Sequence, residues 1–392
     1  MMRLCLLLAG LAGLAWAAPP EFRQHTIAAD LRGGYQVMAH DVNGDGKPDL
    51  IALASGLTDL LWFENPGWQR RVLASGLRRM INGAACAGME EIAVAHAFEN
   101  QPQNSIGIVS VLTPGPDRTQ PWAVKEIDRL TTSHRLRCAD IDGGGKIVVV
   151  NAPLAGAAAT APDYRDHVPL VFYRPGEWKR QNIGSENEGV VHGIFIHRPD
   201  KSKRDAILTA SFLGIHQYLL GKNGKWGRTM IAGGSPAPWP RSGASDIAVG
   251  KTGKARFLAS IEPWHGNQVV IYTPGRKLWK REVIDDSLVD GHTILTADFD
   301  GDGKEEVVAG FRGAGRSVFL YQFEAKQWRK YKVDDGGIAA AACAASDLNQ
   351  DGRLDLACIG SATTNLKWYE NLGPALRGAP LGRGSAGPPP VK

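Results

Sequence analysis

The sequence predicts an all-β fold made of seven repeats, and two periodic features support this. A turn that is acidic in its best copies recurs at intervals of 42 to 58 residues. Its aligned positions are Lys47, Met89, Lys146, Arg204, Lys254, Lys304 and Arg353. A Trp followed by a basic residue and an apolar ending recurs with the same period, in segments 68–73, 122–127, 178–183, 226–231, 279–284 and 328–333. A repeat of this length suits one four-stranded blade, so we predict a seven-bladed β-propeller over residues 18–372.

The Trp segments also predict how the ring closes. Six of them read as outer strands with alternating faces, but the turns define seven blade interiors. The last interior ends at Leu366–Asn371 with no such segment after it. We therefore expect Phe22–Ala28 to be the outer strand of the seventh blade, which closes the ring and removes the free sheet edge.

Both ends of the chain are predicted to lie outside the propeller. Residues 1–17 read as a secretory signal peptide: Arg3, an apolar run over 4–14, and an A-x-A site at Ala15–Ala17. That apolar run is too short to span a membrane, and no other segment is long and apolar enough. Residues 373–392 are rich in Pro and Gly and are expected to be disordered. The mature protein is thus expected to be secreted or periplasmic.

Charge and cysteine content exclude some partners. The formal charge of +5 falls to +1 once Arg3 and the three basic residues of the tail are set aside, which argues against nucleic-acid binding. The remaining cysteines show no zinc spacing and lie in apolar or small-residue stretches: Cys86, Cys138, Cys343 and Cys358. We interpret them as buried free thiols, with one disulfide as the alternative. We expect a monomer.

Three of the repeat turns have the spacing of a calcium loop. Acidic or amide side chains stand at positions 1, 3 and 5, a Gly follows, and a further carboxylate stands at position 9. The predicted ligands are Asp41, Asn43, Asp45 and Asp49; Asp298, Asp300, Asp302 and Glu306; and Asp347, Asn349, Asp351 and Asp355. Oxygen ligands at this spacing converge on a hard cation, so we predict structural calcium. The alternative is an acidic hairpin turn that binds nothing.

These loops resemble those of the FG-GAP/VCBS repeat family of β-propellers, which carry D-x-[DN]-x-D-G-x-x-[DE] between two strands. The resemblance implies the propeller fold for almost the whole mature chain. It also implies an interaction module, because blades of this family often serve to bind a partner.

Strand order predicts that the chemistry lies away from these loops. The chain runs outward through each blade, so the calcium loops join the first strand to the second, on one face. On the opposite face, His134, His192 and His292 share one repeat position at the start of a first strand. Tyr35, Leu77, Ser242 and Ala341 hold that position in the other blades. His265 lies in a loop on the same face, so we predict that the four histidines form one site over the channel.

This histidine cluster fits more than one chemistry. Three imidazoles with Gln268, Glu262 or water would suit zinc or manganese, or a histidine could act as a general base beside a sugar. The alternative is three histidines that share a position by descent. Basic and aromatic side chains on this face would suit an acidic sugar: Arg32, Arg78, Arg79, Arg135, Arg241, Arg312, Arg316, Trp239 and Trp264. The long loop Asn151–Pro169, with Tyr164 and His167, could cover the channel.

The four histidines and the W-H-G-N-Q stretch that starts at Trp264 also resemble the propeller of aldos-2-ulose dehydratases and, more loosely, seven-bladed polysaccharide lyases. In those enzymes a metal or a His/Tyr pair assists removal of a proton next to a carbonyl or carboxylate. Two functions therefore remain open. One is a binding propeller for a carbohydrate or protein ligand, and the other is a metal- or histidine-assisted sugar lyase, dehydratase or epimerase.

Overall fold

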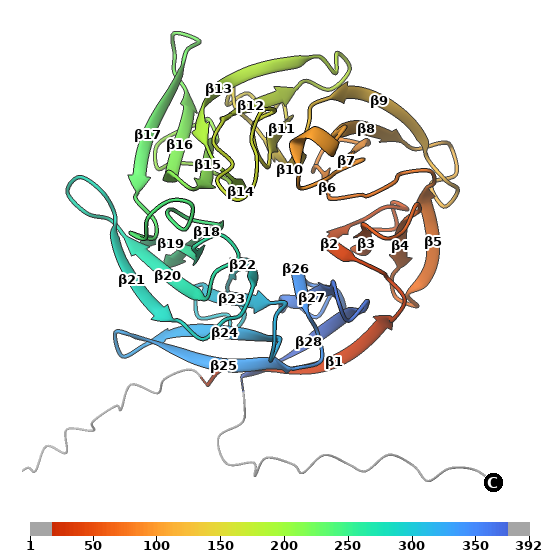
Figure 1. The fold of residues 1–392 in the computed structure, drawn as a ribbon. Helices are drawn as coiled ribbons and strands as arrows, with labels where there is room; N and C mark the ends of the chain where they lie inside the picture. Colours follow the sequence, from red (N-terminus) through yellow and green to blue (C-terminus); the bar gives the residue numbers. More distant parts are fainter. Residues whose placement is uncertain (1–17, 375–392) are drawn as a thin grey trace, which may run out of the picture.

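The computed structural model describes residues 18–374, which form a ring of seven four-stranded antiparallel sheets (Figure 1). The prediction of a seven-bladed β-propeller is confirmed. Six blades each use four consecutive strands, which run from the channel outward. They are β2 (Gly34–His40), β3 (Asp49–Ala54), β4 (Leu60–Glu64), β5 (Gln69–Ala74); β6 (Asn82–Ala85), β7 (Ile92–His96), β8 (Ile108–Thr113), β9 (Ala123–Arg129); β10 (Ser133–Ala139), β11 (Val148–Pro153), β12 (His167–Tyr173), β13 (Arg180–Glu188); β14 (Val191–His197), β15 (Ala206–Ser211), β16 (Gly214–Leu220), β17 (Trp226–Ala232); β18 (Asp246–Thr252), β19 (Ala255–Glu262), β20 (Gln268–Thr273), β21 (Lys280–Asp285); β22 (Gly291–Ala297), β23 (Glu306–Phe311), β24 (Ser317–Glu324) and β25 (Gln327–Asp335).

The seventh blade is built from both ends of the described chain. β26 (Ala340–Ser346), β27 (Asp355–Gly360) and β28 (Leu366–Pro374) are completed by β1 (Pro20–Ala28), which pairs antiparallel with β28 (Figure 1). The expected closure by the N-terminal strand is therefore confirmed. β28 extends through Pro374, two residues into the segment predicted as tail. The predicted signal peptide and the rest of the tail lie outside the described residues.

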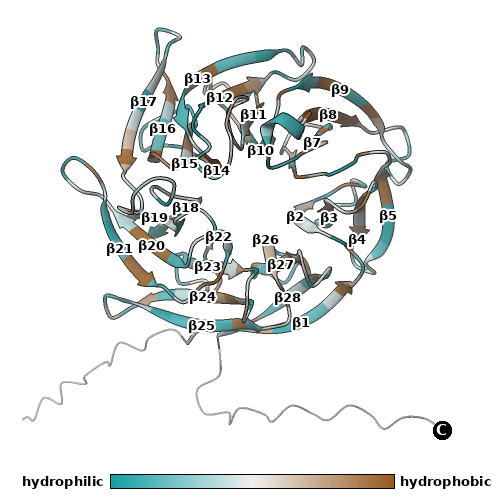
Figure 2. Cartoon of the chain, viewed as in Figure 1, coloured by the Kyte–Doolittle hydropathy of each residue, from teal (hydrophilic) through white to brown (hydrophobic). Residues whose placement is uncertain are grey.

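The Trp segments are the outer strands, as expected. They coincide with or overlap β5, β9, β13, β17, β21 and β25, the fourth strand of each of the first six blades. Figure 2 shows hydrophilic stretches along the outer strands β1 and β25, whose residues alternate between exposed and partly buried. The hydrophobic core lies between neighbouring blades: Ile51 and Trp62 of the first blade share one apolar cluster with Ile92 and Val94 of the second.

The cysteines form two disulfides, so the interpretation as free thiols is wrong. Cys86 follows β6 and bonds to Cys138 in β10, which joins the second blade to the third. Cys343 bonds to Cys358 within the seventh blade, where the strand register places the two residues opposite each other with Cα atoms 4.1 Å apart. Both contacts depend on strand register and blade neighbours, which the sequence spacing of the cysteines does not reveal.

Helical structure in residues 18–374 is confined to one short 3₁₀ turn, η1 (Pro102–Asn104). No helix in this part of the chain has the length and apolar character needed to cross a membrane.

Candidate functional site

The histidines on the first strands sit at β-bulges. His134 in β10, His192 in β14 and His292 in β22 are each the second residue of the strand, and each is skipped by the pairing register with the neighbouring strand. Tyr35 in β2 and Ala341 in β26 occupy the same bulged position. A bulge adds a residue that is not paired and turns its side chain in a new direction. Here it aims side chains from several blades at one another across the channel.

Two blades do not follow this pattern, so the expected alignment at Leu77 and Ser242 is wrong. Both residues precede their first strands, since β6 begins at Asn82 and β18 at Asp246. Neither strand has a bulge in its pairing with the next one. The turns after β6 and β18 hold six and two residues, against eight in the other blades, so a fixed count back from the turn lands in the loop before the strand.

The four predicted histidines lie together. Ring centroids are 5.1 Å apart for His134 and His192, 4.9 Å for His192 and His265, and 5.1 Å for His265 and His292. One nitrogen from each of His192, His265 and His292 falls within 4.8 Å of the others, close enough to hold one metal ion. His134 stands beside this group of three.

Neighbouring groups hold the Nδ1 side of the three rings. His292 Nδ1 donates to the carbonyl oxygen of Ala341 at 2.6 Å, and His192 Nδ1 lies 3.2 Å from Ser245 Oγ. His265 Nδ1 lies 3.3 Å from a carboxylate oxygen of Asp290 and also 3.3 Å from Arg312 Nη2, which donates to it. A ring whose Nδ1–H donates, as that of His292 does, presents the lone pair of Nε2, the form that binds metal. Asp290 thus lies beside a ring of the cluster, whereas three other acidic residues near the histidines in the sequence contact other groups: Glu186, Glu188 and Asp286.

The Nε2 atoms of the cluster lie close together. The Nε2 atoms of His192 and His265 are 3.3 Å apart, and among residues 18–374 the Nε2 of the buried His292 has no hydrogen-bond partner. Buried polar atoms are nearly always bonded, so an orphan aimed into such a cluster needs an explanation. An all-imidazole donor set suits zinc and related transition metals.

Burial keeps the four rings neutral near pH 7. It lowers the pKa of His134, His192 and His292 well below the usual value, and lowers that of His265 to about 4. The positive charges of Arg135 and Arg312 act in the same direction on nearby rings. A neutral imidazole is the form needed to bind a metal or to accept a proton.

The backbone is strained at some residues of this site. His265 and its partner Asp290 adopt positive φ angles of 50° and 59°, and so do Arg79 and Tyr164 on the loops around the channel mouth. A residue other than Gly held in this region costs about 1–3 kcal/mol and persists only where the surroundings enforce it. Such residues concentrate at functional sites.

A cavity of about 270 Å³ opens above the histidines. Its walls include Tyr35, His134, His192 and His265, with Trp264, Arg79, Phe98 and Arg312 around them. Of the predicted basic and aromatic residues, Arg79, Arg312 and Trp264 line this cavity. The remaining ones do not: Arg32, Arg78, Arg135, Arg241, Arg316 and Trp239.

The long loop between β11 and β12 reaches toward the cavity, as expected. Tyr164 is buried and packs edge-on against Trp264 with ring centroids 5.6 Å apart, while Trp239 donates its indole N–H to the carbonyl of Asp163. His167 is exposed at the start of β12 and does not join the cluster.

Sequence reasoning did not assign a role to Tyr35, although it lies at the same repeat position as the histidines. Its hydroxyl lies 2.8 Å from His134 Nε2. Arg135 Nη1 also donates to that nitrogen at 3.3 Å, so Nε2 acts as the acceptor of both.

The predicted calcium loops are local hydrogen-bonded turns on the other face. Asp298 accepts backbone N–H groups from Gly301 and Gly303, and Glu306 accepts one from Phe299. Asp298, Asp300 and Glu306 bring three carboxylates within 4.8 Å of one another. Burial, with Asp300 nearby, raises the pKa of Glu306 to about 8.

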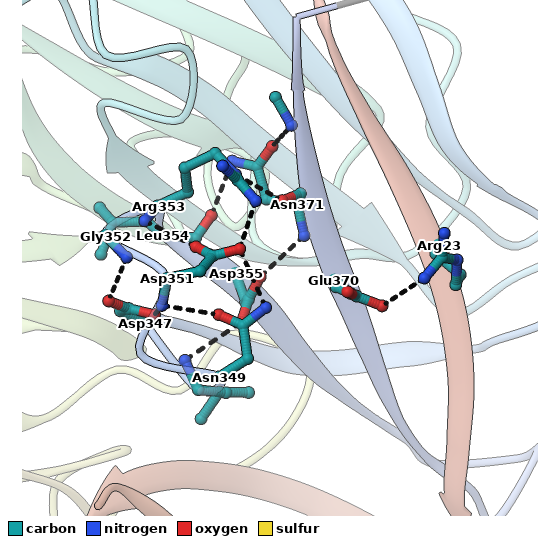
Figure 3. A network of polar contacts seen from close by, with 12 residues as sticks. Arg23, Asp347, Asn349, Asp351, Gly352, Arg353, Leu354, Asp355, Glu370 and Asn371 are labelled. Carbon is teal, nitrogen blue, oxygen red and sulfur yellow. Dashed lines mark hydrogen bonds and ion pairs between the residues drawn. The ribbon is translucent and has the colours of Figure 1, made fainter.

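The loops at Asp41–Asp49 and Asp347–Asp355 repeat this arrangement and link the first and last blades. Figure 3 shows Asp347 accepting from Asp351 and Gly352, and buried Asp355 accepting from the backbone of Asn371. Asp49 makes the equivalent bond with Asn65, whose side chain reaches the carbonyl of Leu348 in the other loop. Asn43, Asp45, Asn349 and Asp351 accept or donate within their own loops. In the third loop, Asp302 is paired with Lys304.

Comparisons with known proteins agree with the fold. Residues 107–275 match the family model "Aldos-2-ulose dehydratase, beta-propeller domain", and residues 298–358 match that of the FG-GAP-like repeat. The first match contains His134, His192 and His265, and the second contains two of the predicted calcium loops. The resemblances to these two families are confirmed.

A curated relative and solved structures extend this result. The chain is 25% identical over 307 residues to aldos-2-ulose dehydratase of Phanerodontia chrysosporium, covering 69% of this chain and 33% of the relative, so it spans about a third of that protein's length. Among similar solved structures is U3-55K, with 8% identity and a TM-score of 0.59, covering 90% of this chain and 99% of that one. Another is the WD40 propeller of Doa1, with 12% identity and a TM-score of 0.55, covering 88% of this chain and 97% of that one. These structures support the propeller fold alone.

Proposed function

We propose that this protein is a metal-dependent propeller enzyme that eliminates water or another group from a small sugar-type ligand bound over the channel. The observation that carries the proposal is the convergence of His192, His265 and His292, whose nitrogens lie within 4.8 Å of one another. The similarity to a protein named aldos-2-ulose dehydratase supports a hydroxylated carbonyl compound as the substrate class.

The three rings would hold zinc or manganese through Nε2. When bound, such an ion would act as a Lewis acid toward a ligand oxygen. Ala341, Ser245 and Asp290 hold the other side of the rings, which orients them before the ion arrives.

The Tyr35–His134 pair is the proposed proton carrier. The Tyr35 oxygen takes the proton on the carbon next to the substrate carbonyl as the phenol proton passes to His134 Nε2, 2.8 Å away. The C–H electron pair becomes the new C=C bond, and the β-hydroxyl leaves as water with the proton that His134 received from Tyr35, which returns both side chains to their starting forms. No oxidant or reductant is needed. Trp264 and Phe98 wall the cavity and would exclude water from the ligand.

We further propose that the acidic loops bind structural calcium and that the protein is exported. The oxygen spacing of the loops and the raised pKa values of Asp49 and Glu306 support the first point, because a cation would relieve buried negative charge. The N-terminal sequence of residues 1–17 and the paired cysteines support the second, since disulfides persist in oxidising compartments.

A second candidate function is binding without chemistry, to a carbohydrate or protein. It is favoured by the fact that the chain spans only 33% of the curated relative, so much of that protein has no counterpart in this match. In this case the channel site would recognise its ligand and release it unchanged.

The test combines metal content with turnover. Purified wild type should retain about one zinc or manganese per chain, and His192→Ala or His292→Ala should lose it. His25→Ala, in the outer strand β1, is the matched control and should keep the metal. With an aldos-2-ulose as substrate, the wild type should generate the absorbance of a C=C bond conjugated to a carbonyl. If the wild type holds metal but does not convert the substrate, the second candidate function, binding without chemistry, takes the place of the enzyme. If the wild type holds no transition metal, the proposed metal centre is refuted.

A further inference from the structure

Two arginines in the channel carry charge that no carboxylate neutralises by direct contact. Arg135 is 5% exposed, and its guanidinium donates to imidazole nitrogens: His134 Nε2 at 3.3 Å and His192 Nε2 at 3.4 Å. Arg137, two residues further along β10, donates to Asn82 Oδ1 at 3.0 Å and to the carbonyl of Leu136 at 2.8 Å. Among residues 18–374, neither forms an ion pair. A buried charge without a paired charge is costly, so such an arrangement calls for an anion.

The charges around these arginines do not balance. Asp246 on β18 lines the same part of the channel and supplies one negative charge against two positive ones. Arg312 is already bound by both carboxylate oxygens of Asp290, at 3.1 and 3.0 Å. A divalent ion at the histidines would add two further positive charges. The channel therefore favours a ligand that brings negative charge with it.

Arg135 lines a cavity, so a ligand could reach it. A second cavity of about 200 Å³ lies along the channel and is lined by Arg135, Arg137, Asp246 and His292. Tyr35 lines both this cavity and the one above it. Both volumes are below the range of about 300–1,000 Å³ typical of pockets for drug-sized ligands, which indicates one small molecule.

From these observations we propose that Arg135 is the centre of an anion subsite, and that the ligand at the histidine cluster is a small sugar acid whose carboxylate binds there. The proposal rests on the proposed function and specifies its substrate class. The planar guanidinium pairs with a carboxylate through two parallel hydrogen bonds. A metal at His192 would take the lone pair to which Arg135 Nη2 now donates, which frees the N–H groups of Nη2 for the carboxylate.

The experiment compares a charged sugar with its neutral counterpart. Calorimetric titration of the zinc-loaded full chain with D-glucuronate, D-glucose and acetate should show binding of both carboxylates and much weaker binding of glucose. A charge-assisted hydrogen bond contributes about 1.5–3 kcal/mol, so Arg135→Met should weaken glucuronate binding about 10- to 150-fold and leave glucose unchanged. Arg135→Lys, which keeps the charge but not the planar fork, should give a smaller loss and guards against a folding defect of the first variant.

The control variant changes a positive charge far from the channel. Arg276→Gln removes one positive charge from the exposed hairpin between β20 and β21 and should bind glucuronate like the wild type. The subsite would be overturned by any one of three results. The wild type could bind glucose as tightly as glucuronate, it could fail to bind carboxylates, or both Arg135 variants could bind glucuronate as the wild type does. Zinc content is measured on the same samples. Zinc without carboxylate binding refutes the subsite alone, whereas carboxylate binding by a chain that holds no zinc refutes the metal centre alone.

Discussion

The two faces of the propeller satisfy their buried polar groups in opposite ways. In the acidic loops each position-1 and position-9 carboxylate accepts backbone N–H groups from its own turn or the adjoining strand, as Asp298 and Asp355 do. In the histidine cluster, His192, His265 and His292 come from three blades, and the Nε2 of His292 has no hydrogen-bond partner within residues 18–374. The loop carboxylates are therefore satisfied by the fold itself, whereas this histidine nitrogen is not.

Removing calcium should have the largest effect on stability and should separate the two faces. A ligand present at 100 times its Kd stabilises the native state by about 2.7 kcal/mol per site, so three loops would contribute about 8 kcal/mol. A calcium chelator should lower the melting temperature strongly, and added calcium should restore it. His292→Ala should show the same response, because its site lies at the other end of the channel. A melting temperature that does not change with chelator would refute calcium binding by the loops.

Removing a disulfide should have the next largest effect. The chain-entropy estimate for the 52-residue separation of Cys86 and Cys138 is about 4 kcal/mol, and for the 15-residue separation of Cys343 and Cys358 about 3 kcal/mol. We expect the double variant Cys86→Ser/Cys138→Ser to lose more unfolding free energy in urea than Cys343→Ser/Cys358→Ser. The response to calcium should persist in both, since all four cysteines lie outside the acidic loops. The reverse order would show that packing between blades, and not loop closure, determines the cost.

Buried histidines outside the channel should make the fold sensitive to acid. Burial lowers the pKa of His96 and of His216 to about 4. Because the folded pKa is below the unfolded value of about 6.5, the unfolded chain binds more protons between these two values, and stability is lost as the pH falls through that window. At pH 5 each residue should cost about 2 kcal/mol relative to pH 7. The measurement is urea unfolding at both pH values: His96→Gln and His216→Gln should each reduce the difference, and a difference identical to that of the wild type would contradict the assignment.

The parts that sequence predicts well are the local ones. The spacing of acidic residues within nine positions, as in Asp298–Glu306, is enough to identify a loop. The Trp segments recur once per blade, so the number of blades and the closure of the ring also follow from short patterns. The histidine cluster is less local, but three of its members share one repeat position. The bulge that aims them could not be read from the pattern, because one extra residue in a strand leaves the apolar alternation almost unchanged.

What sequence did not reveal depends on which blades face each other. The bond between Tyr35 and His134 crosses from the first blade to the third, and the Cys86–Cys138 bond joins two blades through their side-by-side packing. Asp290 is two residues from His292 in the sequence, yet the ring it contacts is that of His265. In each case the contact is set by the closed ring, a property of all seven sheets together.

The smallest predicted effect tests whether the histidines are held as metal ligands. Asp290→Asn keeps a side chain of the same shape and suits the positive φ of 59° at this position, because Asn tolerates the left-handed region. It removes the negative charge that lies 3.3 Å from His265 Nδ1 and that also binds Arg312. Loss of a partner that orients a metal-bound histidine costs about 10- to 100-fold in metal affinity, and we expect the lower end because the amide oxygen can still accept a hydrogen bond.

Zinc affinity, measured by competition with a chromogenic chelator, should fall about 10-fold, while the calcium-dependent melting temperature stays that of the wild type. Asp286→Asn, in the same loop, is the matched control and should leave both quantities unchanged, because Asp286 bonds to Asn267 through its backbone carbonyl, which the substitution keeps. If Asp290→Asn binds zinc as tightly as the wild type, the carboxylate does not orient His265, and the convergence of the rings must come from the bulged strands alone.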